Sequence, residues 1–306
     1  MVTELVGEKE LKFGFMALLT GLLVMTLAVP AALADKKIED AGPASPEGTV
    51  LVENIAGSVQ VVGWDKNEVR VNATLTGDIE EIKFKAGKKK SRIEVVYPKK
   101  KNVNGSADLV INVPHGSRLE VECISASIEV SEVTGRIDVS SISGDVTVNG
   151  ACERIEAESI SGGVFIDGGA PEIEIGSISG KVKARGKVSD IEAGTVSGSI
   201  DLVFDRFLGL NLESVAGDAT VKGDLADDAY FSFDLHSGDL TLIVPADVSA
   251  DFEIETFSGE IDNGFGQKSR KTSKYAPGRE LEFTTGGGDA RVRINTFSGD
   301  VVIQKH

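Results

Sequence analysis

The stretch Ser141-Ile142-Ser143-Gly144 returns 18 residues later as Ser159-Ile160-Ser161-Gly162, then as Ser177-Ile178-Ser179-Gly180, and then as Thr195-Val196-Ser197-Gly198. Related phrases follow at wider intervals, at Ser214 to Gly217, Ser237-Gly238, Thr256 to Gly259 and Thr296 to Gly299. A fixed period of this size is typical of a solenoid, whose units bury their apolar faces against their neighbours. The sequence therefore predicts an all-β protein with a single parallel β-helix (β-solenoid) over residues 49–306, built from coils of about 18 to 21 residues.

Each unit contains two short stretches in which apolar and polar residues alternate, as in Ile155-Glu156-Ala157-Glu158-Ser159 and Val164-Phe165-Ile166. This alternation predicts strands, and stacking the units would align equivalent side chains about 4.8 Å apart. Counting by twos from Ile155 places Ser159 and Ser161 on the inner face but leaves Val164 out of phase. One residue must be absorbed near the glycine, so we expect the repeated glycines to line one edge of the stack. The preference of parallel crossovers for one hand favours right-handed winding.

The composition limits the function. The chain has 306 residues, a net charge of −16, 35 glycines and few aromatic residues. A strongly acidic protein is a poor partner for nucleic acid, because neutralising phosphates requires a basic face. No residue pattern nominates a cofactor.

The amino-terminal region predicts export. An apolar run from Phe13 to Val29 precedes Ala32-Leu33-Ala34, which is typical of a signal peptide over residues 1–34 with a mature start at Asp35. We therefore expect a periplasmic or secreted protein. The alternative is an uncleaved amino-terminal membrane anchor, since 17 apolar residues can just span a bilayer. Residues 35–48, with Pro43 and Pro46, are interpreted as a linker.

The segment Leu240 to Pro245, followed by Phe252 to Ile261, resembles the bacterial putative-adhesin repeat family of β-solenoids. Leu109 to Pro114 resembles the same pattern, and Gly57 to Asp65 is similar to the first coils of that family. The resemblance covers residues 49–304. It implies a secreted or surface-associated protein without enzymatic activity.

The fold is also compatible with two other chemistries, polysaccharide cleavage and calcium binding. Some parallel β-helices are polysaccharide lyases or hydrolases, but a glycosidase needs a specific pair of carboxylates across a cleft, and no local motif supplies one. Asp145, Asp218, Asp239, Glu260 and Asp300 follow repeat glycines and could form a calcium ladder. Gly163, Lys181 and Ser199 interrupt that series, so solvated carboxylates are the better interpretation.

The histidines and cysteines predict no site. His115, His236 and His306 lack the spacing of a metal site. His236 interrupts an apolar column, and we expect it to be a tolerated substitution there rather than a ligand. Cys123 and Cys152 fall in different columns of the repeat, which favours two small space-filling side chains over a disulfide, although the sequence does not exclude one.

Two basic clusters contrast with the acidic total. The first could contact an anionic envelope polymer, or its charges could protect strand edges; it comprises Lys83, Lys85, Lys88, Lys89, Lys90, Arg92, Lys99, Lys100 and Lys101. The second, for which we favour edge protection, lies in an expected protruding loop at Gly264 to Gly278 and comprises Lys268, Arg270, Lys271 and Lys274.

One column of the repeat is apolar throughout: Ile142, Ile160, Ile178, Val196, Val215, Phe257 and Phe297. If these side chains point outward, they form an interaction stripe. We expect them in the core instead, because proteins rarely leave so many apolar groups in water.

These patterns together predict a noncatalytic scaffold or adhesin-like binding protein of the cell envelope. Its expected partner is an envelope component or surface polymer. End-to-end self-association through an uncapped last coil at Val301-Val302-Ile303 is a further expectation.

Overall fold

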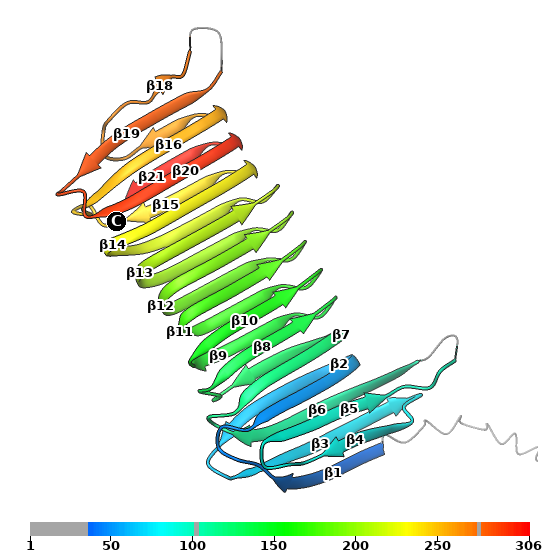
Figure 1. Ribbon diagram of the computed structural model, residues 1–306. Helices are drawn as coiled ribbons and strands as arrows, with labels where there is room; N and C mark the ends of the chain where they lie inside the picture. Colours follow the sequence, from blue (N-terminus) through cyan, green and yellow to red (C-terminus); the bar gives the residue numbers. More distant parts are fainter. Residues whose placement is uncertain (1–35, 101–103, 274–276) are drawn as a thin grey trace, which may run out of the picture. The chain divides into compact units, whose positions relative to one another are not determined.

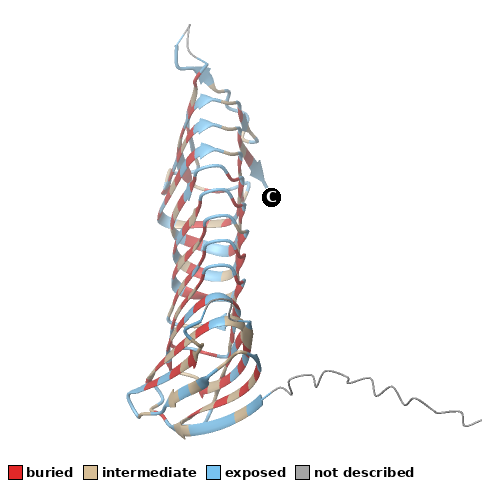
Figure 2. Ribbon diagram, turned by 90° about the vertical axis from the view of Figure 1, so that its right-hand side faces the viewer, coloured by how far each residue is buried: buried red, intermediate tan, exposed pale blue. Residues whose placement is uncertain are grey.

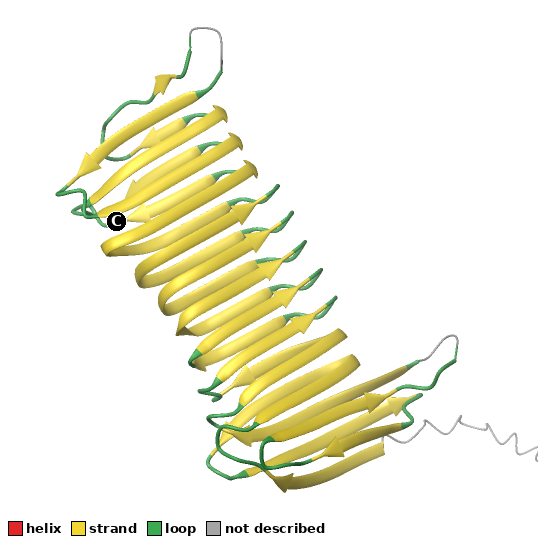
Figure 3. Ribbon diagram, viewed as in Figure 1, coloured by secondary structure: helices red, strands yellow, loops and turns green. Residues whose placement is uncertain are grey.

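A computed structural model describes residues 36–100, 104–273 and 277–306. The predicted signal peptide, the cleavage position before Asp35 and the alternative membrane anchor lie outside these residues. Twenty-one strands form one continuous sheet in the described part of the chain, which contains no helix that could span a membrane (Figures 1 and 3). The prediction of an all-β parallel solenoid is confirmed; its hand stays a prediction.

The central coils follow the 18-residue period residue by residue. Their strands pair in parallel with the next coil, so that Val146, Val164, Val182 and Ile200 form one column. They comprise β8 (Arg136–Ser141), β9 (Val146–Ala151), β10 (Arg154–Ser159), β11 (Val164–Ser177), β12 (Val182–Thr195) and β13 (Ile200–Ser214). Buried and exposed residues alternate along these strands, as Figure 2 shows, because successive side chains of a strand point to opposite faces.

A buried hydroxyl forms the corner at the end of most repeat strands. The Ser159 hydroxyl accepts a hydrogen bond from the Gly162 amide (3.0 Å) and donates one to the Gly144 carbonyl of the preceding coil (3.1 Å). Ser141 and Ser177 make the equivalent pairs of bonds. The serine therefore satisfies two backbone groups inside a narrow turn, where both would otherwise lack a partner.

The repeated glycines do line one edge, as predicted, but mainly because of crowding. A Cβ on Gly162 would overlap the Gly144 carbonyl, and a Cβ on Gly180 would overlap that of Gly162. Among the glycines predicted for this edge only Gly238 has a positive φ, of 157°, and Gly57, which aligns with them through Ala126, has a φ of 111°. Close approach of backbones, rather than an unusual dihedral angle, selects glycine here. The phase is also lost earlier than predicted, since Ser161 is exposed and Ser159 is the last inward residue of its strand.

The coils lengthen where aromatic rings fill the interior. Phe204, Phe207, Phe231 and Phe233 are buried and contact one another edge to face, with ring centroids 5.2 to 6.1 Å apart. The successive columns starting at Ile200, Ala219 and Leu240 are 19 and 21 residues apart. A larger interior needs a longer perimeter, so the period expands.

The amino-terminal end is closed by antiparallel strands. In stacking order, β2 (Thr49–Trp64) lies between β7 (Arg118–Ser131) and the pair β5 (Lys90–Val96) and β6 (Gly105–Pro114). Beyond them, β3 (Glu68–Gly77) pairs antiparallel with β6, and β4 (Glu81–Lys85) pairs antiparallel with β5. The first parallel coil is thus inserted between two later ones.

The linker interpretation of residues 35–48 is wrong for most of that segment. Strand β1 (Lys36–Pro43) pairs antiparallel with β3 along eight residues, from Lys36 opposite Leu75 to Pro43 opposite Glu68. The turn that follows buries Ala44. The charged residues of this segment suggested a linker, but an outer edge strand is exposed and tolerates charged residues.

The carboxyl-terminal end is interleaved in the same way. Strand β14 (Ala219–Ser237) pairs with β20 (Ala290–Ser298), and β20 pairs in turn with β16 (Ala250–Ser258). On the other wall, β21 (Val301–Lys305) lies between β15 (Leu240–Val244) and β17 (Ile261–Asn263). Val301-Val302-Ile303 is therefore not an uncapped edge, and the expected end-to-end association loses that premise.

Antiparallel strands cover β16 at this end. Strand β19 (Arg279–Thr285) pairs with β16, and β18 (Arg270–Lys271) pairs with β19. The predicted loop at Gly264 to Gly278 leads into this cover, and its residues 274–276 lie outside the described part of the chain (Figure 1).

Replacing the corner hydroxyl tests its structural role. We expect Ser159→Ala to lower the free energy of unfolding by about 1–3 kcal/mol, because the Gly162 amide and the Gly144 carbonyl both lose a buried partner. Chemical denaturation measures the change. The matched control is Ser161→Ala, two residues away and exposed, which should change stability by less than about 0.5 kcal/mol. Equal effects of the two substitutions would contradict this role of the hydroxyl.

Candidate interaction surface

The most conspicuous surface feature is an apolar row, with one residue from each of ten stacked coils. Its aliphatic and phenylalanine members are between 41% and 54% exposed. The strand registers place its members in this spatial order: Ile55, Ile124, Ile142, Ile160, Ile178, Val196, Val215, His236, Phe297 and Phe257. At about 4.8 Å per coil, the row extends for roughly 43 Å.

The expectation that this column lies in the core is wrong. The inward position belongs to the serine before it, whose hydroxyl occupies the corner, so Ile160 sits on the outside of the turn. The turn continues the ladder between coils, because the Ile160 amide donates to the Ser141 carbonyl (3.1 Å) and the Ser161 amide to the Ile142 carbonyl (2.9 Å). The backbone of the row is therefore hydrogen-bonded from coil to coil, as the strands are.

Two members of the apolar row, Ile55 and Ile124, were missed from the sequence. Ile124 lies 18 residues before Ile142 and follows Cys123, which replaces the corner serine. Asn54-Ile55-Ala56-Gly57 is another form of the repeat phrase, and the buried Asn54 side chain donates to the Ala107 carbonyl. Both could have been found by extending the period toward the amino terminus and accepting small polar substitutes at the corner.

The apolar row ends in a stack of three rings. The His236 and Phe297 rings lie 5.0 Å apart and nearly parallel, and the Phe297 and Phe257 rings lie 4.9 Å apart. Because Phe297 lies between the other two rings, both of its faces are covered. A sugar ring stacks on an open aromatic face, so Phe297 is a poor platform for one, and the stacking gives His236 a packing role.

A groove of about 990 Å³ runs beside the apolar row from Ile142 to Phe297. Its other side is formed by the residue two positions before each row member, such as Glu158, Glu213 and Asp234. At two neighbouring coils these positions are Gly176 and Gly194, where an added Cβ would meet at most one distant carbonyl. The missing side chains open the groove at its middle.

A row of small residues borders the apolar row on the opposite side. The residue after each row member is serine in eight of the ten coils and alanine in the other two; the serines are Ser125, Ser143, Ser161, Ser179, Ser197, Ser237, Ser298 and Ser258, and all are exposed. The surface therefore has three parallel columns: a mainly acidic column with six carboxylates, two glycines, Ser140 and Asn295, then the apolar row, and then a column of serines with two alanines.

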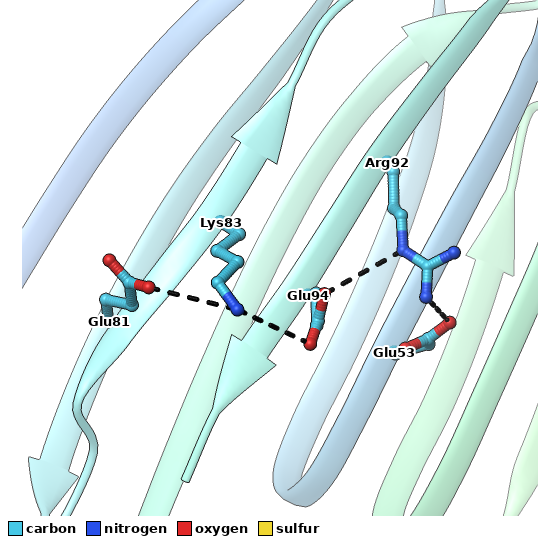
Figure 4. Close-up of polar contacts among 5 residues, drawn as sticks. All are labelled: Glu53, Glu81, Lys83, Arg92 and Glu94. Atoms are coloured by element: carbon cyan, nitrogen blue, oxygen red, sulfur yellow. Dashed lines mark hydrogen bonds and ion pairs between the residues drawn. The ribbon is translucent and has the colours of Figure 1, made fainter.

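The first basic cluster is partly neutralised. Figure 4 shows Lys83 of β4 between Glu81 and Glu94, at 3.9 Å from each, and Arg92 of β5 beside Glu53 of β2 at 2.6 Å. Lys100 pairs with Asp78 at 2.9 Å. These three cations balance acids on neighbouring strands, so they are poor candidates for contacting an anionic polymer.

The remaining lysines of that cluster divide between the two ends of β5. Lys85, Lys88, Lys89 and Lys90 are exposed at the β4–β5 turn, and form no ion pair among the described residues. Lys99 lies beyond the far end of β5, and Lys101 is outside the described residues. The eight described residues of this cluster do not gather into one patch, and only the turn at Lys85 to Lys90 remains as a candidate contact site. We call it the lysine turn.

The second basic cluster is dispersed. Arg270 pairs with Glu280 across β18 and β19 at 2.8 Å. Lys268 and Lys271 are exposed, and Lys274 lies outside the described residues.

The acids after the repeat glycines have a structural function. Asp145 accepts a hydrogen bond from the Gly163 amide, Asp218 from the Asp239 amide, and Asp300 from the Glu260 amide, at 2.7 to 2.9 Å. Each carboxylate thus bridges to the next coil at the corner, which the interpretation as solvated carboxylates missed. No group of three or more His, Cys, Asp or Glu residues with metal-binding geometry occurs in the described ranges.

Cys123 and Cys152 are free thiols. Burial raises the pKa of the Cys123 thiol to about 12 and that of Cys152 to about 11. Raised pKa values keep both side chains protonated at neutral pH, so neither is an activated nucleophile.

An acidic column lies on the outer face of the same strands. Glu120, Asp138, Glu156, Glu174 and Glu192 occupy equivalent positions in consecutive coils. Desolvation by burial raises the pKa of Asp138, and Glu156 and Glu120 raise it further. The pKa of Glu158, beside this column, is raised by desolvation and then by Glu174 and Glu156. Repetition at the coil spacing thus forces like charges together.

These observations define the class of protein as an all-β solenoid with a long, exposed apolar row. The chain matches the Toastrack DUF4097 family over residues 49–304 and belongs to that family. The resemblance to a putative-adhesin repeat family is thereby confirmed. No curated protein matches the chain.

Several solved structures are similar to this chain at low sequence identity. A protein of Parabacteroides distasonis described as a putative lipid binding protein is 11% identical, with a TM-score of 0.51, over 88% of this chain and 97% of that one. A putative adhesin of Parabacteroides merdae is 9% identical over the same shares, with a TM-score of 0.47. A putative cell adhesion protein of Clostridium sporogenes is 13% identical, with a TM-score of 0.27, over 89% of this chain and all of that one.

The raised carboxyl pKa values predict how stability depends on pH. Between the unfolded-state pKa and the raised folded-state pKa, the folded protein binds more protons, so these groups make the free energy of unfolding fall as pH rises. We expect Asp138→Asn and Glu158→Gln each to increase stability at neutral pH, by less than about 1 kcal/mol because both groups are partly exposed. The gain should vanish at pH values below the unfolded-state pKa.

Thermal unfolding across a pH series checks this expectation. Glu129→Gln is the control for removing one negative charge, since Glu129 is exposed on β7 outside the acidic column. If Asp138→Asn and Glu158→Gln stabilise no more than Glu129→Gln at neutral pH, the coil spacing does not impose the proposed repulsion.

Proposed function

We propose that this protein is an exported, noncatalytic scaffold or adhesin-like binding protein of the cell envelope that docks other molecules along the apolar row. The single observation that carries the proposal is the exposure of this row over ten consecutive coils. Soluble proteins rarely leave contiguous apolar surface of this extent uncovered unless it is an interaction site. Export is supported by the apolar run and Ala-x-Ala pattern before Asp35.

A carbohydrate-active enzyme is the weaker alternative. The carboxylates nearest the groove, Glu158, Glu213 and Asp234, lie in one column along a single wall. A glycosidase needs its two carboxyl groups on opposite sides of the scissile bond. An apolar wall facing this column supplies no second carboxylate, so the groove is suited to binding.

Export is tested by expressing the full-length chain and fractionating the cells. We expect the protein in the periplasmic or secreted fraction with an amino terminus at Asp35, because the segment before it has the order of a signal peptide. Amino-terminal sequencing identifies the cleavage position. Recovery of uncleaved chain in the membrane fraction would establish the anchor instead, and cytoplasmic recovery would contradict export altogether.

Envelope binding is tested by sedimenting the protein with isolated envelope fragments. We expect Ile160→Lys/Ile178→Lys to reduce binding at least about tenfold, because two charges interrupt the centre of the apolar row. Val110→Lys/Leu208→Lys is the matched control, since these exposed side chains (40% and 45%) lie outside the row. Equal binding by both variants would contradict docking along the row.

The lysine turn is tested in the same assay. If it contacts an anionic polymer, Lys88→Glu/Lys89→Glu/Lys90→Glu should weaken binding, and the wild-type protein should bind less as salt increases. Lys268→Glu/Lys271→Glu is the control for charge reversal elsewhere. Unchanged binding by the triple variant at every salt concentration would eliminate the lysine turn as a contact.

A further inference from the structure

We infer that the partner of the apolar row is a second copy of this chain, docked side by side with the two stacks parallel and in register. This inference rests on the proposed function in one respect: both treat the row as a docking surface. It goes further in naming the occupant and its orientation. Three observations support it: the size of the surface, the groove beside the row, and the distribution of polar groups on its two flanks.

The size fits a stable protein interface. The apolar row and its two bordering columns contribute three residues from each of ten coils, or thirty residues. A standard interface uses about 20–30 residues and about 800 Å² from each partner, with an apolar centre and a polar rim. Here the apolar residues occupy the central column and the polar residues the outer two.

The groove matches a ridge of the same molecule. The apolar row is a ridge, and the groove runs parallel to it along the side that carries Glu158, Gly176 and Gly194. With a two-fold axis parallel to the stack, the row of each copy enters the groove of the other. Both have the same spacing of about 4.8 Å, so a fit at one coil is repeated at the next.

The alternative two-fold axis, perpendicular to the stack, lacks this fit. It reverses one copy, sets ridge against ridge and leaves the grooves facing each other. It also brings the carboxylate-bearing columns of the two copies together at the centre, where Glu158 of one copy would meet Glu213 of the other. Like charges at close range oppose association.

The flanking columns favour the parallel arrangement. In that arrangement the carboxylate column of one copy faces the serine column of the other at the same coil. Glu158 then lies beside Ser161 of the second copy, and Glu122 and Asp234 lie beside Ser125 and Ser237. Serine hydroxyls can donate hydrogen bonds to these carboxylates. Gly176 and Gly194, at the centre, leave room for the opposing Ile178 and Val196.

Sedimentation equilibrium of the exported protein across the micromolar range tests the association. We expect the wild type and Val110→Lys/Leu208→Lys to approach twice the monomer mass as concentration rises. Ile160→Lys/Ile178→Lys should weaken the dimer by at least about tenfold. A wild-type protein that stays monomeric at every concentration would overturn the inference.

Cysteine cross-linking tests the orientation, in a background of Cys123→Ser and Cys152→Ser. Ile124→Cys and Phe297→Cys lie near opposite ends of the apolar row. In the parallel dimer, each variant oxidises to a disulfide dimer by itself. In the antiparallel dimer, neither does, because like positions are seven coils or roughly 34 Å apart, and only a mixture of the two cross-links. Cross-linking in the mixture alone would overturn the parallel register.

The outcomes separate this inference from the proposed function. A monomer whose envelope binding is lost in Ile160→Lys/Ile178→Lys overturns the dimer and leaves the proposed function standing. A parallel dimer that does not bind envelope fragments supports the dimer and contradicts the envelope role.

Discussion

The spacing of the backbone ladder controls this structure. Parallel hydrogen bonds between coils hold equivalent residues about 4.8 Å apart, so residues that recur in the sequence repeat become direct neighbours along the stack. Interior columns of Val146, Val164, Val182 and Ile200 gain from this repetition because like shapes pack well. The same spacing places Asp138 beside Glu120 and Glu156, where the repulsion between like charges is unfavourable. It also generates the apolar row, since one isoleucine per coil becomes a continuous surface.

The hydroxyl corner explains why this surface exists at all. A turn of four residues must satisfy the glycine amide and the preceding coil's carbonyl, and a buried serine does both. Having placed serine inside, the chain has to place the next residue outside. In a protein without a partner, a polar residue would be favoured at this exposed position. The choice of Ile, Val or Phe in nine of ten coils is therefore informative about interaction rather than about folding.

The sequence predicts the stack, the period and the glycine edge, because each depends on local repetition that can be read directly. It does not predict the side on which Ile160 lies, since two orientations of the corner satisfy the same alternation and only the hydrogen bonds of Ser159 distinguish them. Nor does it predict that Lys83 and Arg92 are neutralised, because Glu53 reaches Arg92 from a strand 39 residues away. Strand β1 was not predicted for a related reason. An outer strand with no buried face lacks the alternation of apolar and polar residues that identifies a strand in the sequence. Information carried by long-range pairing is absent from the repeat phrase.

The interleaved ends bear on how the chain acquires its fold. Strand β21 follows β15 and β17 in the sequence, yet it lies between them in the sheet. Strand β2 is likewise paired only with strands that come later in the sequence, β5, β6 and β7. Winding therefore cannot proceed coil by coil from one terminus to the other. The regular middle is free to nucleate first, while each end remains open until a distant segment arrives to fill its gap. Closure at the carboxyl end therefore has to wait for β21, and a chain that lacks this strand would carry an unfilled slot lined by two unpaired strand edges.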